Sequence, residues 1–280
     1  MLDRRTFIAA IGGSALAAVA LSKTASLKVG VCTRDVAGAV KYGFDYIEPA
    51  AADIAAMSDD QFKQYADTVL ASPLRCHAFN SFIRRPDLKV VGEQVPTAAL
   101  KEYVEMALPR CKRLGADVVV WGSAGSRNVP EGFPRERAND QIAEFLGMAG
   151  DIARKNRLTL AIEPLRHQES NILNTGAEAL AMVRKVKHPN VRMIIDYYHM
   201  REANEDSQIL EIARNEIVHI HFANPHGRLW PHDLSEDDHY ADFFQRLKKI
   251  GYSGGISIEG KGSFDQDGEA SLNFFRRALA

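Results

Sequence analysis

Short apolar runs alternate with longer amphipathic segments along most of the chain. The runs are rich in Val, Ile, Leu and Ala and end at turn residues or charges, which is typical of buried β-strands. The segments between them carry apolar residues at helical spacing, and several begin with Ser, Thr, Asn or Asp as an N-cap. Eight strands are predicted, over residues 27–33, 45–48, 75–79, 117–122, 158–163, 192–196, 217–222 and 255–259.

Helices are predicted between these strands and after the last one. A glycine that ends a helix recurs just ahead of a strand, as in Gly43-Phe-Asp, Gly115-Ala-Asp and Gly251-Tyr-Ser. This repetition predicts a single-domain α/β fold, the (β/α)₈ TIM barrel. A doubly wound sheet is the alternative, but the first turn, Thr33-Arg-Asp-Val, lacks the glycines of a dinucleotide fingerprint. The helices are expected over residues 36–42, 58–71, 97–114, 139–156, 176–187, 206–214, 240–250 and 268–278.

Four residues that can bind a metal stand at or near the ends of predicted strands five to eight: Glu163, Asp196, His221 and Glu259. The carboxyl ends of all strands of such a barrel lie on one face, where these enzymes carry their chemistry. Three carboxylates and one imidazole favour Mn²⁺, with Mg²⁺ or Co²⁺ as alternatives, over a structural zinc. The pattern predicts one metal site whose open positions let a substrate bind through neighbouring carbonyl and hydroxyl oxygens.

Composition and charge exclude some other classes of protein. The chain has 280 residues, of which 46% are hydrophobic and 25% charged, with a formal net charge of −1. These values are ordinary for a globular protein, and they give no basic surface for nucleic acid. We expect a small-molecule partner, and no stable membrane span once the N-terminal segment is removed, because no later run approaches about 20 apolar residues.

The N-terminus resembles a twin-arginine export signal. Arg4-Arg5-Thr-Phe-Ile precedes a small-residue apolar stretch that continues to Leu21, and cleavage is expected near Ala25. Residues 1–25 are therefore interpreted as a signal peptide and 26–280 as the barrel, with the mature protein in the periplasm. An uncleaved anchor helix is the alternative.

Two further features of the sequence, its cysteines and its long irregular stretches, do not by themselves predict a catalytic residue. The three cysteines, Cys32, Cys76 and Cys111, have no metal spacing and are expected to be buried apolar residues. The long irregular stretches 123–137 and 224–238 follow strands, so they are expected on the catalytic face. Such loops are often lids or binding loops, although ordinary surface excursions are nearly as common.

Several motifs resemble those of the sugar phosphate isomerase/epimerase family: Glu163-Pro-Leu, Asp196-Tyr-Tyr-His-Met, His219-Ile-His and Ile258-Glu. That family has a xylose isomerase-like TIM barrel and includes D-tagatose and D-psicose 3-epimerases. The order of elements agrees over the mature chain, while the specific motifs lie in its C-terminal half. The resemblance implies a metal-dependent isomerase of carbohydrate metabolism. It also implies assembly of identical chains, although no feature selects a dimer or a tetramer.

The resemblance also implies roles for the four strand-end residues. Glu163 and Glu259 would both bind the metal and exchange protons with the substrate from opposite faces, and Asp196 and His221 would complete the coordination. Two opposed bases permit inversion at the carbon next to a carbonyl through an enediolate. A single base moving between carbons would instead give aldose–ketose isomerisation.

Substrate contacts are implied at Glu169 and His199, where the family's epimerases hydrogen-bond sugar hydroxyls. A structural histidine at a strand–helix turn is the alternative interpretation of His199. Arg228 resembles the family's substrate arginine, but it follows the metal histidine by one residue more than usual, so His226 is a rival.

Other residues near the ends of strands are weaker candidates for the sugar pocket. His77 and Asn80 lie near the end of the third predicted strand, and Trp121 lies on the fourth, where barrel packing is an equal interpretation. His219 shares a strand face with His221 and is expected one layer deeper, as a core or supporting histidine.

Three alternative functions remain open. A lyase or dehydratase of the same fold would act on 3-keto glycosides or inososes, because an enediolate can expel a leaving group. A non-catalytic sugar-binding barrel would need no pair of glutamates. An endonuclease IV-like DNA repair enzyme would need further ligands in the early strands and a basic surface, and the sequence shows neither.

Overall fold

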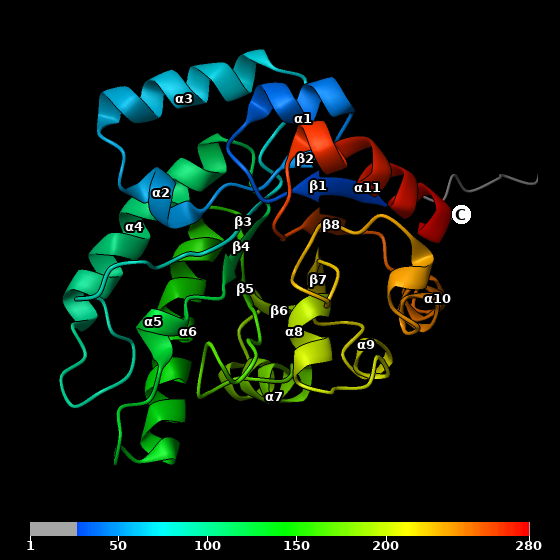
Figure 1. The fold of residues 1–280 in the computed structure, drawn as a ribbon. Helices are drawn as coiled ribbons and strands as arrows, with labels where there is room; N and C mark the ends of the chain where they lie inside the picture. Colours follow the sequence, from blue (N-terminus) through cyan, green and yellow to red (C-terminus); the bar gives the residue numbers. More distant parts are fainter. Residues whose placement is uncertain (1–26, 280) are drawn as a thin grey trace, which may run out of the picture.

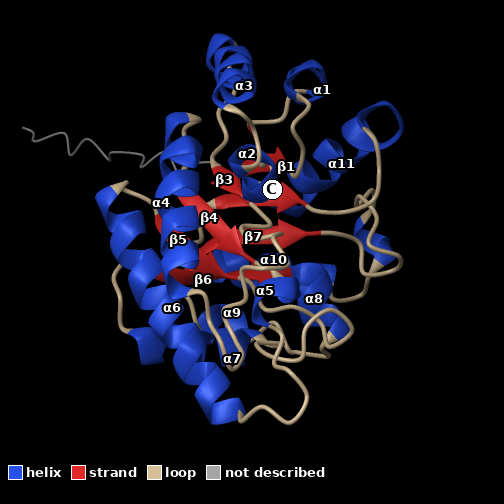
Figure 2. Cartoon of the chain, turned by 90° about the vertical axis from the view of Figure 1, so that its left-hand side faces the viewer, coloured by secondary structure: helices blue, strands red, loops and turns tan. Residues whose placement is uncertain are grey.

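The computed structural model describes residues 27–279, which form one barrel of eight parallel strands surrounded by helices (Figures 1 and 2). Neighbouring strands pair in the order β2-β1-β8-β7-β6-β5-β4-β3. The predicted single-domain TIM barrel is confirmed. The strands are β1 (Lys28–Val31), β2 (Tyr46–Ile47), β3 (Ala78–Phe79), β4 (Val118–Trp121), β5 (Thr159–Ile162), β6 (Val191–Asp196), β7 (Ile217–Phe222) and β8 (Gly255–Ile258).

The barrel closes between β2 and β3, its two shortest strands. Ile47 N donates to Arg75 O at 3.2 Å, Asn80 N donates to Pro49 O at 3.2 Å, and Ala51 N donates to Asn80 O at 2.8 Å. These bonds form a seam that joins the two edges of the sheet, so the barrel is nearly continuous.

The long helices agree with the amphipathic pattern to within a few residues. For example, α1 begins after Asp35, whose side chain accepts from Gly38 N, and ends at Gly43 with φ 81°. Four short elements, α2, α5, α8 and η1, were not predicted, because one or two turns show no clear helical period. The helical elements are α1 (Val36–Tyr42), α2 (Ala51–Ala55), α3 (Asp59–Ala71), α4 (Thr97–Arg113), α5 (Ala124–Arg127), α6 (Arg135–Lys155), α7 (Gly176–Val186), α8 (Tyr197–Glu202), α9 (Ile209–Ile212), η1 (Leu234–Glu236), α10 (Tyr240–Lys249) and α11 (Phe264–Leu279).

All strands run toward the face that Figure 1 views, and in Figure 2 their arrows point the same way. The loops that follow the strands therefore surround the mouth of the barrel on this face. The stretch 123–137, predicted to be irregular, includes α5 and the first residues of α6.

The interior of the barrel is divided between two kinds of side chain. On one side, β3 to β6 contribute a small apolar cluster, separate from the main core that packs the strands against the helices. On the other side, β2, β7 and β8 contribute buried polar side chains. The apolar cluster is Ala78, Val118, Val120, Ala161 and Ile194, and the polar group is Tyr46, Glu48, His219, His221 and Ser257.

The cysteines are unpaired thiols, as expected, but one of them is not a core residue. Cys76 and Cys111 are buried, whereas Cys32 is partly exposed just past the end of β1. The interpretation of Cys32 as a residue of the apolar core is corrected, because β1 ends one residue earlier and leaves Cys32 beside Glu48 and His221.

Within residues 27–279, no helix is long and apolar enough to cross a membrane. The predicted signal peptide, residues 1–25, lies outside the part of the chain that the structure describes.

Candidate metal centre

The four predicted metal ligands converge at the mouth of the barrel. Glu163 directly follows β5, Asp196 ends β6, His221 lies in β7 and Glu259 directly follows β8. One ligand atom from each lies within 4.8 Å of the others. Four residues on four separate strands thus form one compact cluster of three carboxylates and an imidazole.

The imidazole of His221 lies between carboxylates on both sides. Its Nδ1 is 2.8 Å from Glu163 Oε1 and 3.3 Å from Glu259 Oε2, and its Nε2 is 2.8 Å from Glu48 Oε1. Burial alone would lower the pKa of His221, but Glu48, Glu259 and Glu163 outweigh it and raise this pKa well above its usual value. The cluster therefore favours positive charge at its centre.

The two glutamates of the cluster differ in their surroundings. Burial and the neighbouring Glu259 raise the pKa of Glu163. Burial has the same effect on Glu259, but His221 and Arg228 outweigh it and lower the pKa of Glu259 to about 2. Arg228 is paired with the carboxylate of Glu259 and not with that of Glu163, which contributes to the difference between their pKa values.

Asp196 presents a buried oxygen that has no hydrogen-bond partner among the described residues. Its Oδ1 accepts from His199 N at 3.1 Å and caps α8, whereas Oδ2 is buried and unpaired. Such orphaned atoms are uncommon in folded proteins and need an explanation. A divalent cation fits these residues, because it would bind this oxygen and balance the three carboxylates.

His199 has features of both predicted roles, a structural histidine and a contact to the substrate. It is buried in α8, and its Nδ1 accepts from Arg166 N at 3.3 Å, which is a structural contact. Because Nδ1 accepts, the ring proton is assigned to Nε2. This Nε2 is unpaired among the described residues, 3.8 Å from Asp196 Oδ2.

Arg228 reaches the cluster in spite of its unusual spacing. Its Nη2 is 2.7 Å from Glu259 Oε2 and its Nη1 is 3.5 Å from Glu169 Oε1, and the guanidinium lies over the Tyr198 ring, 4.9 Å from the centroid. The backbone of Arg228 is left-handed, with φ 56°. The rival, His226, is exposed. The structure thus brings Arg228 and Glu169 to the site and leaves His226 outside it.

Two predicted pocket residues lie elsewhere, and both predictions are corrected. His77 precedes β3, with Nδ1 3.2 Å from Asp117 Oδ2, so it lies at the end of the barrel away from the mouth. Trp121 is fully buried and packs against Phe145 of α6, with ring centroids 5.2 Å apart. Side chains alternate along a strand, and because Val120 faces the interior, Trp121 faces the helices.

Asn80 is the residue that β3 contributes to the mouth. Its side-chain amide donates to Glu259 Oε1 at 3.1 Å. Asn80 lies just past the end of β3, in the position that sequence reasoning assigned jointly to Asn80 and His77.

Glu48 is the main residue of the site that sequence reasoning missed. It is fully buried just past β2, and its carboxylate contacts both His219 and His221. A signal was available, because Ile47-Glu48-Pro49 repeats the tripeptide Ile-Glu-Pro found at residues 162–164. His219 is also fully buried, one layer below His221.

Gly122 was also missed, and it makes room for a predicted ligand. A Cβ atom added at Gly122 would lie 1.6 Å from Glu163 Oε2. No side chain can occupy this position unless the carboxylate moves. Glu163 therefore owes its placement to the absence of a side chain at the end of β4.

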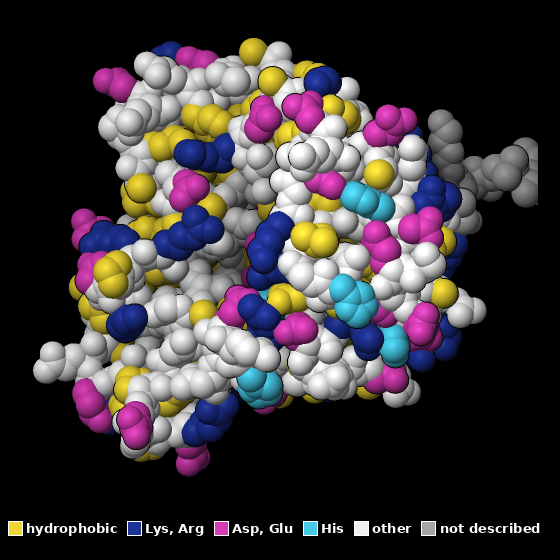
Figure 3. All heavy atoms as spheres, viewed as in Figure 1, with side chains coloured by type: hydrophobic (Ala, Val, Ile, Leu, Met, Phe, Trp, Pro, Cys, Tyr) yellow, Lys and Arg dark blue, Asp and Glu magenta, His cyan; other side chains and the backbone are white. Residues whose placement is uncertain are grey.

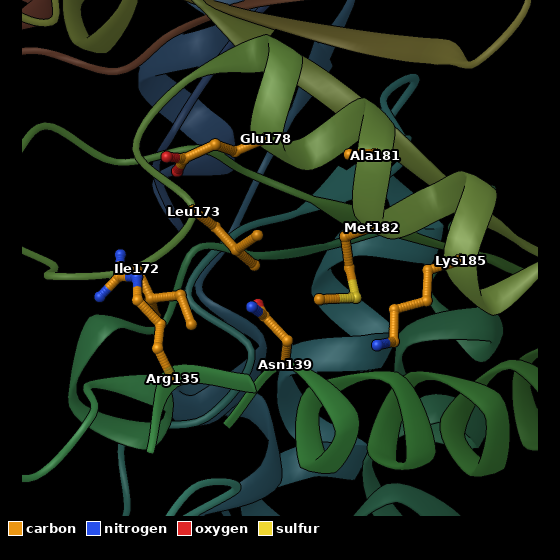
Figure 4. A pocket seen from close by; sticks show the side chains of 8 residues that line it. All are labelled: Arg135, Asn139, Ile172, Leu173, Glu178, Ala181, Met182 and Lys185. Atoms are coloured by element: carbon orange, nitrogen blue, oxygen red, sulfur yellow. The ribbon is translucent and has the colours of Figure 1, made fainter. Parts of the chain in front are cut away.

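Two cavities differ in their relation to the cluster. One of about 400 Å³ opens beside Gly122, and Figure 3 shows the mouth face hollowed near its centre, with Lys and Arg side chains along the rim. The other, about 250 Å³, lies between α6 and α7 on the outside of the barrel (Figure 4). The first borders Gly122, where the absence of a side chain leaves room for Glu163. It is lined by Ser81, Ile83, Arg84, Arg85, Pro86, Lys89, Gly122, Ser123, Ala124 and Gly125.

This geometry places the chain among TIM barrels with a carboxylate and imidazole cluster at the carboxyl ends of their strands. More specifically, the chain belongs to the xylose isomerase-like TIM barrel family, whose model matches residues 36–278.

Several relatives are enzymes that act on sugars. The chain is 28% identical over 233 residues to an L-ribulose 3-epimerase of Methylomonas sp., covering 80% of this chain and 76% of the relative. It is 27% identical over 237 residues to a D-psicose 3-epimerase of Agrobacterium fabrum, covering 78% and 75%. Its fold is similar to that of 3-keto-D-glucoside 4-epimerase from E. coli, with a TM-score of 0.74 and 18% identity over 90% of this chain and 99% of that one.

Proposed function

We propose that this protein is a divalent-metal-dependent sugar epimerase or isomerase that moves a proton at the carbon next to a carbonyl. The observation that carries the proposal is the pair Glu163 and Glu259, which flank His221 Nδ1 at 2.8 and 3.3 Å within one cluster. The names of two relatives, an L-ribulose 3-epimerase and a D-psicose 3-epimerase, support this class of reaction.

The metal would be held by Glu163, Asp196, His221 and Glu259, with Mn²⁺ preferred and Mg²⁺ or Co²⁺ as alternatives. A bound ion of this kind supplies polarisation of the substrate carbonyl, which makes the neighbouring C–H more acidic. Asp196 Oδ2, which is buried and has no hydrogen-bond partner among the described residues, supports a cation at this site.

The chain's own residues perform the proton transfer. One glutamate removes the proton to give an enediolate, and the other returns a proton to the opposite face, which inverts the carbon. Arg228, paired with Glu259 at 2.7 Å, would orient this carboxylate and face the substrate. His199 Nε2 can donate to a sugar oxygen, and Glu169 can accept from a hydroxyl.

The substrate is proposed to be a keto-sugar or a keto-glycoside. The cavity of about 400 Å³ beside Gly122 gives room for the part of the molecule that lies beyond the reacting carbons. A lyase acting on 3-keto glycosides is the second candidate. The same cavity favours it, because this space could hold a departing group.

The test is deuterium uptake from D₂O, measured by mass spectrometry on a panel of ketoses and 3-keto glycosides with Mn²⁺-loaded protein. We expect one deuterium at the carbon next to the carbonyl, and its loss in Glu259→Gln. Glu202→Gln is the matched control, because Glu202 lies at the mouth but pairs with Arg166 outside the cluster. An inverted product indicates an epimerase, and an unsaturated one a lyase. Absence of exchange across the panel with metal bound would contradict the proposal.

We also propose that residues 1–25 direct export to the periplasm by the twin-arginine route. The support is the sequence Arg4-Arg5-Thr-Phe-Ile ahead of an apolar stretch. Cell fractionation should find the mature protein in the periplasm, and Arg4→Lys combined with Arg5→Lys should retain it in the cytoplasm. Unchanged export of the double variant would contradict this route.

A further inference from the structure

The carboxylate of Glu48 lies in the layer beneath the metal cluster, and both of its oxygens have hydrogen-bond partners. Its Oε1 is 2.8 Å from His221 Nε2, its Oε2 is 2.8 Å from His219 Nε2, and Ser257 Oγ donates to the same Oε2. All four residues are fully buried. A buried carboxylate is tolerated only when it is paired in this way.

The fold itself does not require a charge at this level of the barrel. On the opposite side of the interior, β4, β5 and β6 fill the space with Val120, Ala161 and Ile194. Apolar side chains of similar volume commonly match or exceed the stability that a buried ion pair gives. The polar half therefore calls for a reason other than stability.

The surroundings of Glu48 are built to hold it in one place. Tyr46 Oη lies 2.8 Å from Ser257 Oγ, so the hydrogen bonds extend one step further from the carboxylate. The Tyr46 ring fits only because two strands present glycine there, since an added Cβ would lie 2.2 Å from the ring at Gly30 and 2.6 Å from the hydroxyl at Gly255.

The contact with His221 decides which ring nitrogen faces the cluster. A neutral imidazole has one donor and one acceptor nitrogen, and a metal ligand must use the acceptor. Glu48 Oε1 lies 2.8 Å from Nε2, so Nδ1, which faces Glu163 and Glu259, is the ring nitrogen left for an ion.

A second group of metal-type side chains, Cys32, Glu48 and His221, shares the same imidazole. In this group the carboxylate already accepts from two histidines and a serine. On the His221 ring, the side that faces Glu48 therefore supports the site, and the opposite side, at Nδ1, would bind the ion.

We propose that Glu48 is a positioning residue of the metal centre, which holds the His221 ring with Nε2 against its own carboxylate and Nδ1 turned toward the other ligands. Partners of this kind fix the orientation of a ligating histidine and strengthen it as a ligand. The inference rests on the proposed metal site, but not on the identity of the sugar.

The experiment compares Mn²⁺ affinity, from the electron paramagnetic resonance signal of free Mn²⁺, in the wild-type chain and in Glu48→Gln. We expect a weakening of about 10- to 100-fold, with a changed visible spectrum of the Co²⁺ form. Glu205→Gln is the matched control, because Glu205 accepts only from Gly176 N and Ala177 N at the start of α7. Its affinity for Mn²⁺ should equal that of the wild type.

An unchanged affinity in folded Glu48→Gln would overturn the inference. If that variant fails to fold, Ser257→Ala removes one donor to Glu48 without touching His221, and it should weaken Mn²⁺ binding to a smaller extent.

The outcomes also separate this inference from the proposed reaction. Weakened Mn²⁺ binding in Glu48→Gln, with no sugar exchange by the wild type, would reject the epimerase and keep the positioning role. A wild-type chain that bound no divalent ion would reject both.

Discussion

The two sides of the barrel interior are filled in opposite ways. The side formed by β3 to β6 is lined below the mouth by Val and Ile side chains with two alanines, which form an apolar cluster of their own. The side formed by β2, β7 and β8 carries Tyr46, Glu48, His219, His221 and Ser257 at comparable depth. Both are closely packed and hidden from water.

The apolar side holds the strands together, whereas the polar side orients one imidazole, that of His221. Apolar filling stabilises a barrel without specifying orientation, because dispersion and burial are not directional. Hydrogen bonds are directional, and a buried network is stable only if its members are satisfied. The polar side therefore restricts His221 to one ring orientation, while the apolar side supplies folding free energy. The predictions below test this division.

The largest expected effect is on stability, from Ile194→Ala on the apolar side. Ile194 is fully buried, and such truncations lower the free energy of unfolding by about 2 to 5 kcal/mol. Mn²⁺ affinity should stay within about threefold, because affinity depends on the polar side. Denaturant unfolding and metal titration of the same preparation measure both quantities. A large loss of affinity would show that the two sides are not independent.

Gly122→Ala should impair activity rather than folding. The new methyl group would meet Glu163 Oε2 at 1.6 Å and displace this carboxylate. Misplacement by about 1 Å can reduce a rate by about 100-fold, which we expect in kcat/KM. Gly125→Ala is the control, since its added Cβ meets nothing within 4 Å. Equal activity of the two variants would show that Glu163 tolerates displacement.

Removal of metal should have a moderate effect on stability. An ion present at ten times its Kd adds about 1.4 kcal/mol to the free energy of unfolding. Unfolding curves with Mn²⁺ and with a chelator should differ by this amount in the wild type and by much less in Glu259→Gln. A similar difference in both proteins would place the ion away from the cluster.

Tyr46→Phe should have the smallest effect. It removes the hydroxyl that lies 2.8 Å from Ser257 Oγ, and three hydrogen bonds separate this hydroxyl from His221. One such bond contributes about 1 kcal/mol to the free energy of unfolding. Thermal or denaturant unfolding measures this change. A loss above about 3 kcal/mol would mean that the hydroxyl supports the whole polar side.

Much of the fold follows from the sequence, since apolar runs mark the strands and caps mark the longer helices. The convergence of Glu163, Asp196, His221 and Glu259 follows from topology as well, because the first charged residue after each buried run falls on one face of a parallel barrel. Strand ends were therefore the most informative positions.

The errors concern which face of a strand a side chain occupies. No charged residue at the end of β4 fixes its register, so Trp121 was equally consistent with the interior and with the helices. The strand β3 has only two residues and begins later than the predicted strand, so His77 lies outside it. Glu48 was missed because its partners, His219 and His221, lie 171 and 173 residues away in the sequence.

The seam between β2 and β3 bears on how the barrel moves. Glu48 and Asn80 both lie along this seam, and each reaches across the mouth, the first to His221 on β7 and the second to Glu259 after β8. The two shortest strands are thus tied to β7 and β8 through the ligands themselves. An ion that draws these ligands together would also fasten the barrel at its weakest join, so amide exchange along β2 and β3 would report on occupancy of the metal centre.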